Sequence, residues 1–521
     1  MAVSVGEEPG VPAAPWIGFT AMCAGMFMAI LDIQIVASSL TDIQTALAIP
    51  LDRLSWIQTA YLIAEIVAIP LTSRLTRLLS IGGLFVAAMT GFVAGSIGCG
   101  LSGGFAVLIA FRAVQGFFGG MLIPAVFTSV FVLFPERTRV AATTVAGVFA
   151  VLAPTLGPAV GGFITENLTW HWLFFVNVGP GMAAAATVGA LIRVGRPLWA
   201  LWRRLDYLGV VVLAACLAAL QTGLKEGPGR GWSDPLVVLL FGIVAIGGTA
   251  AGWRCLTARE PIIDLRHFSR PSFAIACFYS FVFGAGLYGS VYLLPLFLGI
   301  VRQHTPIEIG EIMIVGGAAQ LAVAPVAAVA EKRLNPLLLV PLGYGLFAAG
   351  LFANAGATVD TDFYGLIVPQ LLRGGGVMLC LLPTTRIALD GRQGDDLTDA
   401  SALFNLMRNL GGAIGIAAID TVIAWRVPVH AGCLAGRLLA GDATVGPLLG
   451  LPVEVLRARM LAPIDNDTRE MAARLVERAA YTLSFDEAWM LLGVLFAASL
   501  LALPLLRRPA PRPQCYQKQG A

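Results

Sequence analysis

The chain is poor in charged residues and in histidine. Only 12% of its 521 residues are charged, whereas a soluble globular protein carries about 25%. The four histidines all lie outside the long apolar runs, and no Ser/His/Asp arrangement accompanies them. The shortage of charge excludes an ordinary soluble protein, and the histidine pattern argues against an enzyme that needs a nucleophile and a general base.

Metal, nucleotide and nucleic-acid chemistry also lack their usual sequence signatures. Of eight cysteines only Cys433 lies clearly in a predicted outer loop, so a disulfide framework is not expected, and no Cys/His spacing indicates a metal site. The phosphate loop of ATP-driven pumps, Gly-x-x-x-x-Gly-Lys-Ser/Thr, does not occur. With a net charge of +3 and no basic cluster, the sequence predicts no nucleic-acid partner and no cofactor.

Long apolar runs are what the chain has in abundance. Hydrophobic residues make up 57% of it, and a run of about 20 of them can cross a bilayer as a helix. The runs predict an all-α integral membrane protein with fourteen spans, near 16–39, 54–73, 80–101, 105–131, 140–164, 172–192, 206–224, 234–253, 272–299, 307–330, 336–356, 363–389, 401–425 and 486–506.

The distribution of Lys and Arg indicates how these spans are oriented. With both ends of the chain in the cytoplasm, most of the 34 Lys and Arg residues fall in short cytoplasmic loops. The short outer loops then hold only Arg53, Lys225, Arg230 and Arg302. This asymmetry follows the positive-inside rule. We therefore expect a multi-pass inner-membrane protein with cytoplasmic segments at 1–15 and 507–521.

Two sequence features occur twice. Leu156–Gly161 and Leu410–Gly415 share the phrase Leu-Gly-x-Ala-x-Gly. An intramembrane arginine followed by glycines and a proline also repeats, at 112–124 and at 373–383. Repeated features at matching spans are typical of transporters built from two related halves.

This repeat divides the chain into parts. Residues 16–192 and 272–506 would form two six-helix bundles, and 206–253 would form two inserted helices. The C-terminal half would include a long outer loop at 426–485 with a helical-looking segment at 467–480. The loop could be a solvated flap, or it could be a docking surface for a partner outside the inner membrane.

Glycines and a proline mark the fifth span. Gly157, Gly161 and Gly162 would let helices approach closely in a bilayer, and Pro158 would remove one backbone hydrogen bond and bend the helix. A bent, closely packed helix could act as a pivot. The simpler alternative is that the glycines form only a contact face.

Asp32 and Arg112 are ionisable residues inside spans, where each charge costs roughly 2.5–3.5 kcal/mol. Both lie about seven residues, or roughly 10 Å, from the outer surface, so we expect them to form a polar pair. Arg112 favours the ionised form of Asp32, whereas a low dielectric favours the protonated form. A proton carrier needs this competition; the alternative is a static ion pair.

Four other ionisable residues lie in or near spans. Glu65, midway along the second span, is a candidate for a second proton site or for a contact with a cationic substrate. Arg373 and Arg408 have no obvious acidic partner at their depth, and they are candidates for a polar cavity or for contacts with an anionic substrate. Glu311 and Asp420 lie near the water interface, where a structural role is favoured.

Five phrases together resemble the major facilitator superfamily, and more narrowly its fourteen-span drug:proton antiporters of the EmrB/QacA type. They are Leu31–Val36, Phe111–Gly116, Gly157–Gly162, Trp172–Asn177 and Phe404–Asn409. The resemblance implies that Arg112 takes part in proton coupling and that Gly157–Gly162 is the antiporter motif. One departure is the loop after the second span, where Ser73–Ser80 lacks the acid and the glycines of the family's gating motif but keeps two arginines.

The sequence thus predicts a proton-coupled multidrug efflux transporter that exports amphipathic compounds by alternating access. The resemblance to the EmrB branch adds a periplasmic adaptor and an outer-membrane channel as expected partners, although the QacA branch works alone. A dedicated exporter of one metabolite, such as a siderophore or another natural product, is the nearest alternative. A non-transporting membrane sensor is a more distant one.

Overall fold

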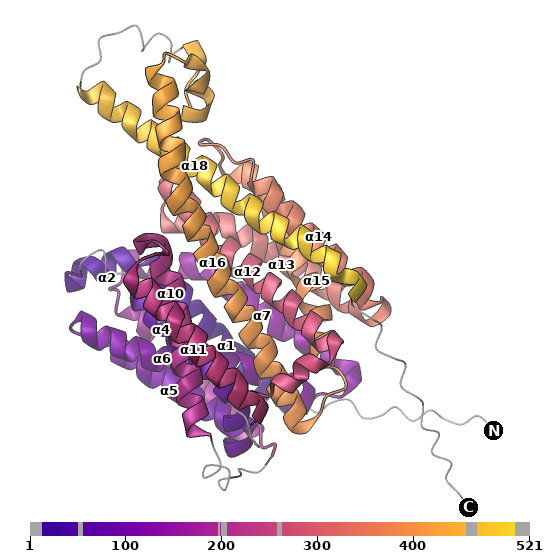
Figure 1. Ribbon diagram of the computed structural model, residues 1–521. Helices are drawn as coiled ribbons and strands as arrows, with labels where there is room; N and C mark the ends of the chain where they lie inside the picture. Colours follow the sequence, from indigo (N-terminus) through magenta and orange to yellow (C-terminus); the bar gives the residue numbers. More distant parts are fainter. Residues whose placement is uncertain are drawn as a thin grey trace, which may run out of the picture.

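The computed structural model consists of long helices that run side by side (Figure 1), and it describes residues 13–49, 56–195, 198, 206–257, 263–454 and 466–505. No strand occurs within these residues. Helices suit this composition, because a helix satisfies its own backbone hydrogen bonds where lipid offers no partners.

The N-terminal half contains α1 (Ala13–Ser38), the short α2 (Leu40–Leu47), α4 (Trp56–Leu79), α5 (Ile81–Gly100), α6 (Phe105–Leu133), α7 (Glu136–Asn167), α8 (Trp172–Phe175) and α9 (Val178–Leu191). The inserted pair is α10 (Tyr207–Arg230) and α11 (Pro235–Thr257), followed by η2 (Leu265–Ser269). The C-terminal half contains α12 (Pro271–Ile300), α13 (Pro306–Arg333), α14 (Pro336–Asn354), α15 (Phe363–Leu389), α16 (Gly394–Leu439), η3 (Ala443–Leu449), α18 (Asn466–Ser499) and η4 (Leu500–Leu505).

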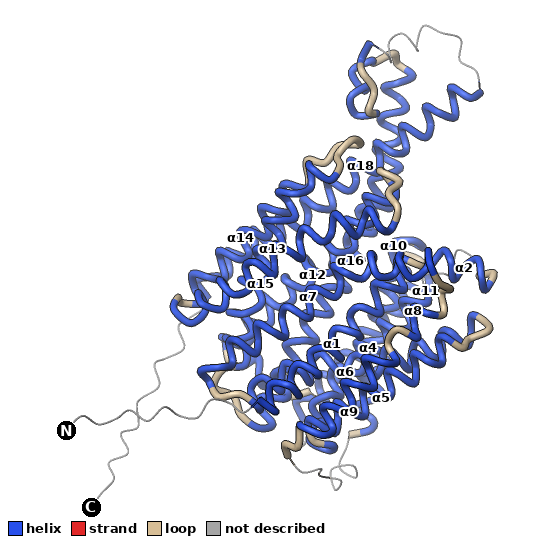
Figure 2. The backbone as a smooth tube through the Cα atoms, turned by 180° about the vertical axis from the view of Figure 1, so that it is seen from behind, coloured by secondary structure: helices blue, strands red, loops and turns tan. Residues whose placement is uncertain are grey.

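The helices agree closely with the expected spans. Twelve described helices are long and apolar enough to cross a membrane, or thirteen with the bent α7, whose parts Glu136–Pro154 and Ala159–Asn167 are inclined by 47°. The long helix α4 occupies the second expected span, although it carries Glu65, Arg74 and Arg77. The start of α1 and the end of α18 lie at the same end of the bundle, which we call the base (Figure 2).

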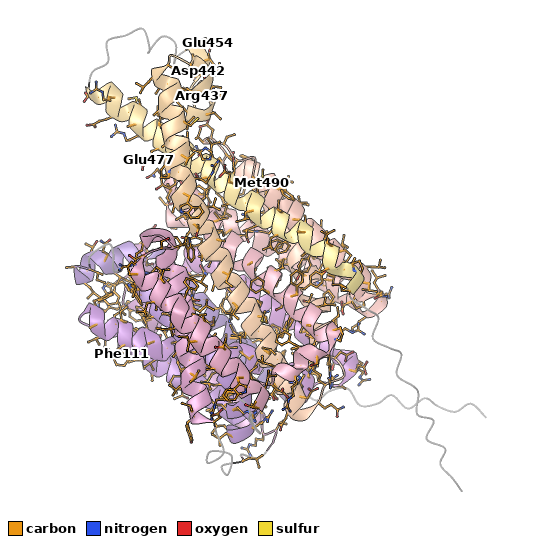
Figure 3. The ribbon with its side chains drawn as sticks, in the orientation of Figure 1. Phe111, Arg437, Asp442, Glu454, Glu477 and Met490 are labelled. Atoms are coloured by element: carbon orange, nitrogen blue, oxygen red, sulfur yellow. The ribbon has the colours of Figure 1, made fainter. Side chains whose placement is uncertain are left out.

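The segment 426–485 is largely helical rather than the expected long loop, and the helix expected at 467–480 is present within α18. Helix α16 continues to Leu439 and α18 begins at Asn466, so both helices extend beyond the bundle and form a helical projection with η3 (Figures 1 and 3). The projection has a small apolar core of its own, which includes Leu434, Val445 and Val476. Charged residues such as Arg437, Asp442, Glu454 and Glu477 lie on it (Figure 3). Because only one face of each helix is apolar, a search for long apolar runs could not detect it.

The two halves meet along two seams. On one seam α7 packs on α13, and a Cβ added to Gly310 would lie only 2.6 Å from the Cβ of Ala159. On the other seam α4 packs on α16, and α10 of the inserted pair contacts both of these helices. One apolar cluster on this second seam joins Ile66 and Ile69 of α4 to Leu217 of α10 and Phe404 of α16.

Candidate functional site

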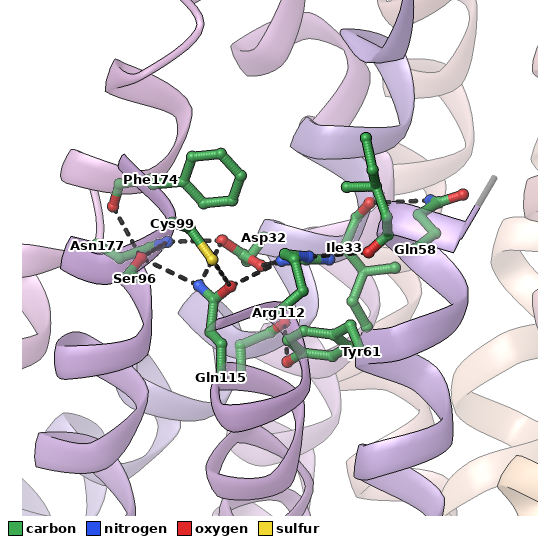
Figure 4. A network of polar contacts seen from close by, with 12 residues as sticks. Asp32, Ile33, Gln58, Tyr61, Ser96, Cys99, Arg112, Gln115, Phe174 and Asn177 are labelled. Atoms are coloured by element: carbon green, nitrogen blue, oxygen red, sulfur yellow. Dashed lines mark hydrogen bonds and ion pairs between the residues drawn. The ribbon is translucent and has the colours of Figure 1, made fainter. Parts of the chain in front are cut away.

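Asp32 lies at the centre of a buried hydrogen-bond network in the N-terminal half (Figure 4). Its Oδ2 accepts a bond of 2.5 Å from Nη1 of Arg112, and both side chains are fully buried. Its Oδ1 accepts bonds from Nε2 of Gln115 at 3.0 Å and from Nδ2 of Asn177 at 2.7 Å. Helices α1 and α6 and the residue before α9 therefore meet at one carboxylate. The expected contact between Asp32 and Arg112 is present.

Arg112 is held from several sides. Its Nε donates to the carbonyl of Ile57 at 3.1 Å, and its Nη1 also donates to Oε1 of Gln115 at 2.8 Å. Its guanidinium lies 4.5 Å from the centre of the Tyr61 ring, a distance at which cation–π attraction is effective. The acid, the carbonyl and the aromatic face compensate for most of the water that this buried cation loses, whereas its Nη2 has no hydrogen-bond partner among the described residues.

Sequence reasoning missed the amide partners of Asp32. Gln115 and Asn177 belong to phrases that carried the family resemblance, but neither was assigned a role there. Both are fully buried, and both also donate to the hydroxyl of Ser96 on α5, at 3.0 Å each. An amide inside an apolar span is a usable signal, because a buried polar group needs a partner.

Glu65 is the other buried carboxylate of this half, with 7% of its surface exposed. It lies one turn along α4 from Tyr61, and α6 packs against its backbone at Gly120. Among the described residues its carboxylate forms no hydrogen bond and no ion pair, and neither oxygen is among the fully occluded, unpartnered polar atoms. The structure therefore does not bring Glu65 into the Asp32 network.

The two glycine phrases occupy equivalent places. A Cβ added to Gly157 of α7 would lie 2.2 Å from the Cβ of Gln34 on α1. In the second copy, a Cβ on Gly411 of α16 would lie 1.9 Å from the carbonyl oxygen of Phe281 on α12. The fifth span of each half thus packs on the first span of that half without room for a side chain. Gly161 and Gly162 are also buried, and Pro158 lies within α7.

The two buried arginines of the C-terminal half differ in their surroundings. Arg373 of α15 donates to Gln370 of its own helix and lies close to Gly316 of α13 and Gly350 of α14, within its own half. Arg408 of α16 donates to Asn405, and its guanidinium lies 5.2 Å from the centre of the Phe127 ring, which belongs to α6 of the other half. Arg408 therefore faces the seam and Arg373 does not.

Glu311 and Asp420 stay outside these clusters. Glu311 is exposed on α13. Asp420 of α16 accepts a hydrogen bond of 2.8 Å from the hydroxyl of Tyr292 on α12, which ties two helices of one half together.

The base of the bundle carries ion pairs between the halves. Arg77, at the end of α4, lies 3.0 Å from Asp395 and 2.6 Å from Asp399 at the start of α16. On the other seam Arg139 of α7 lies 3.9 Å from Asp390, after α15. The motif-like segment Ser73–Ser80 lies mostly within α4 rather than in a loop. It lacks the acid of the family's gating motif, but its Arg77 is paired with acids of the opposite half.

A second polar cluster at the base surrounds Asp396. Arg392 lies 3.0 Å from it, His267 of η2 lies 3.2 Å from it, and Arg270 lies 3.5 Å from it. Burial and the neighbouring Arg392 cation lower the pKa of His267. The start of α16 is therefore fixed both to the N-terminal half and to the segment that follows the inserted helices.

The chemistry available at these sites is proton binding and ion pairing. Within the described residues no group of three or more His, Cys, Asp or Glu side chains could hold a metal ion. Asp32 accepts three N–H bonds, and a proton on it would remove the charge that pairs with Arg112 and would weaken that bond. A carboxylate in this position can couple protonation to movement of α1 against α6.

Comparison with known proteins agrees with this architecture. The model of the Major Facilitator Superfamily matches residues 22–416. The "Colistin resistance protein EmrB" of Acinetobacter baumannii is 36% identical over 416 residues, which are 80% of this chain and 81% of that protein. The "Multidrug export protein EmrB" of Escherichia coli K12 is 29% identical over 413 residues, 79% of this chain and 80% of that protein.

A solved structure shares the fold at much lower sequence identity. The crystal structure of the human organic anion transporter MFSD10 superimposes with a TM-score of 0.57 at 14% identity, over 95% of this chain and all of that chain. Two helical halves, an intact Asp32–Arg112 pair and a family match over most of the sequence lead to one conclusion. The chain belongs to the major facilitator superfamily, in the branch that includes the EmrB proteins.

Proposed function

We propose that the protein exports amphipathic organic compounds across the inner membrane in exchange for protons that enter the cell. The observation that carries this proposal is the buried network around Asp32, a carboxylate that only N–H donors compensate. The relatives named for colistin resistance and multidrug export support a drug as cargo. A membrane potential of 100 mV contributes about 2.3 kcal/mol per proton, which is enough for accumulation of tenfold or more.

The exchange would follow alternating access. The base faces the cytoplasm in this proposal, and the Arg77 and Arg139 ion pairs link the two halves there, so these pairs must separate before the base can open. A proton from outside reaches Asp32, weakens its bond to Arg112 and frees α1 to move. Rocking of the halves along the two seams then opens the base, where the proton leaves and the next cargo molecule enters.

The helical projection supports a partner on the outer side. It extends beyond the bundle on α16 and α18, away from the base (Figures 1 and 2). A periplasmic adaptor that continues to an outer-membrane channel would meet this surface first. Purification of the protein with and without residues 440–465 should show adaptor binding only when the segment is intact. Adaptor binding at equal strength by both forms would contradict this assignment.

Dye efflux from whole cells tests the proposed function. Cells that express the protein are loaded with a fluorescent amphipath without an energy source and are then given glucose. We expect dye loss several times faster than in cells that express Asp32→Asn at the same level, and a protonophore should abolish the difference. Efflux that survives the protonophore, or that is equal in both strains, would refute proton-driven export through Asp32.

A further inference from the structure

Arg408 is a buried cation at the contact between the two halves. Only 6% of its surface is exposed, and it forms no ion pair with any carboxylate in the described part of the chain. Its one hydrogen bond runs to Asn405, one turn earlier on the same helix. Across the seam it faces the ring of Phe127 on α6. An arginine without an acid is costly inside a membrane protein and usually marks a site.

The free donors of Arg408 point to a ligand. Its Nε and Nη1 donate no hydrogen bond, and neither is among the fully occluded polar atoms of the described residues. By contrast, Nη1 of Arg373 is both unpartnered and occluded. Nε of Arg373 is unpartnered and not occluded either, but Arg373 lies within its own half. Arg408 has its accessible donors where the two halves meet.

Other polar groups of the seam lie beside it. The hydroxyl of Tyr288 on α12 donates to Oδ1 of Asn409 at 3.0 Å. Tyr288 is within electrostatic reach of both Arg408 and Glu65, and Glu65 belongs to the opposite half. Asp32 offers no surface to a cargo molecule here, because its side chain is fully buried and bonded to Arg112, Gln115 and Asn177.

We propose that Arg408 binds the anionic group of the cargo, so that the transported class is amphipaths that carry a carboxylate or a similar acid, including zwitterions. A guanidinium offers a planar fork of donors that a carboxylate can accept in pairs. The Phe127 ring is itself buried against Arg408, so the anion would replace this ring as the partner of the cation when the halves separate. This inference rests on the proposed export function and specifies its substrate class.

Three ligands that share a naphthyl group test the inference: naphthylacetate is anionic, naphthylalanine is zwitterionic and naphthylethylammonium is cationic. Binding to the purified full-length protein in lipid nanodiscs is measured by titration calorimetry, without any transport step. We expect Arg408→Gln to weaken naphthylacetate and naphthylalanine at least tenfold and to change naphthylethylammonium less than twofold. Arg408→Lys, which keeps the charge but loses the fork, should weaken the two acids by a smaller factor.

Arg373→Gln is the matched control, because it removes a buried arginine of the same half that does not face the seam. It should leave the preference among the three ligands unchanged. The inference is overturned if wild-type protein binds only the ammonium ligand or none of the three, or if Arg408→Gln weakens all three equally. If Arg408→Gln does not fold, Arg408→Lys replaces it in the test. The inference is then overturned if Arg408→Lys binds the three naphthyl ligands with the same relative affinities as the wild type. Failure of export itself would appear in the dye experiment, which is independent of these affinities.

Discussion

Asp32 and Glu65 are both buried carboxylates of the N-terminal half, but they are bonded very differently. Asp32 accepts bonds from Arg112, Gln115 and Asn177, and none of its surface is exposed. Glu65 accepts none from the described residues. A proton can reach Asp32 only when its neighbours move, whereas Glu65 needs no bond to break. This difference makes Asp32 the residue whose protonation is tied to conformation.

Asn177 should contribute to this network in a measurable way. Its replacement by alanine removes one of the donors to the carboxylate, and a hydrogen bond to a charged group contributes about 1.5–3 kcal/mol. We expect Asn177→Ala to lower the thermal unfolding temperature in detergent by several degrees. The exposed Asn167, which donates only to a carbonyl of its own helix, is the control. Equal unfolding temperatures for Asn177→Ala and Asn167→Ala would show that the network adds no stability.

Asp442 sets the pH dependence of the projection. Hydrogen bonds from Thr444 and Arg437 lower the pKa of Asp442 from 3.8 to about 2. A lowered pKa means that the ionised form stabilises the fold above pH 3.8 and that this contribution is lost as the pH falls through about 2. The turn between α16 and η3 should therefore keep its amide-exchange protection from pH 7 to pH 4. Asp442→Asn should show weaker protection over that whole range, and a wild type that matches the variant by pH 5 would contradict the assignment.

Depth along a span was enough to predict that Asp32 and Arg112 meet. The rise per residue gives the height of a side chain in the membrane, but it does not give the direction in which that side chain points. For this reason the amides of Gln115 and Asn177 were missed. Depth also does not reveal that Arg408 faces the other half, whereas Arg373 faces α13 and α14.

At the scale of helices, the repeated glycine phrase holds the first and fifth spans of each half together. Gly411 has no room for a methyl group, since a Cβ there would lie 1.9 Å from a backbone oxygen. Overpacking of this kind costs about 1–3 kcal/mol. We expect Gly411→Ala to lower the unfolding temperature of the purified protein. Gly432→Ala, in open space on the same helix, should leave it unchanged or raise it slightly, and a similar loss in both variants would contradict the packing argument.

Apolar runs predicted most of the spans, but they did not predict the helical projection. Helices α16 and α18 extend into water with one apolar face each, and they are stable because they bury those faces on one another. A contact between segments 40 residues apart is not visible in a window of 20 residues. The inserted α10 was placed correctly in the chain, but its position against α4 and α16 required the structure.

At the scale of the molecule, the base is closed by charges that come from opposite halves. Arg77 pairs with Asp395, which is 69% exposed, and with Asp399, which is 10% exposed. The pair with Asp399 is therefore better shielded from water than an ordinary surface pair. We expect Arg77→Asp to favour a conformation with an open base, because it places an acid beside two others. Exchanging the charges, with Arg77→Asp and Asp399→Arg together, should restore the closed base.

Distances between spin labels measure this opening. Labels at Glu136→Cys and Lys332→Cys, both exposed at the base, report on α7 of one half and α13 of the other. Cys433, which is exposed on α16, and Cys515, which lies outside the described residues, are first replaced by serine. The long-distance population should rise several-fold in Arg77→Asp and return to the wild-type level in the exchanged pair. A distribution that does not change in Arg77→Asp would mean that these ion pairs do not hold the base closed.

If cargo and protons exchange through Asp32, the purified protein in liposomes should move protons when cargo is present. Purified protein is reconstituted with a pH-sensitive dye inside, and an amphipath is added outside in the absence of any other gradient. We expect proton movement across the membrane with wild-type protein and none with Asp32→Asn. Calorimetry should still detect binding of the amphipath to the variant. Proton movement of equal size in Asp32→Asn would show that protons do not cross through Asp32.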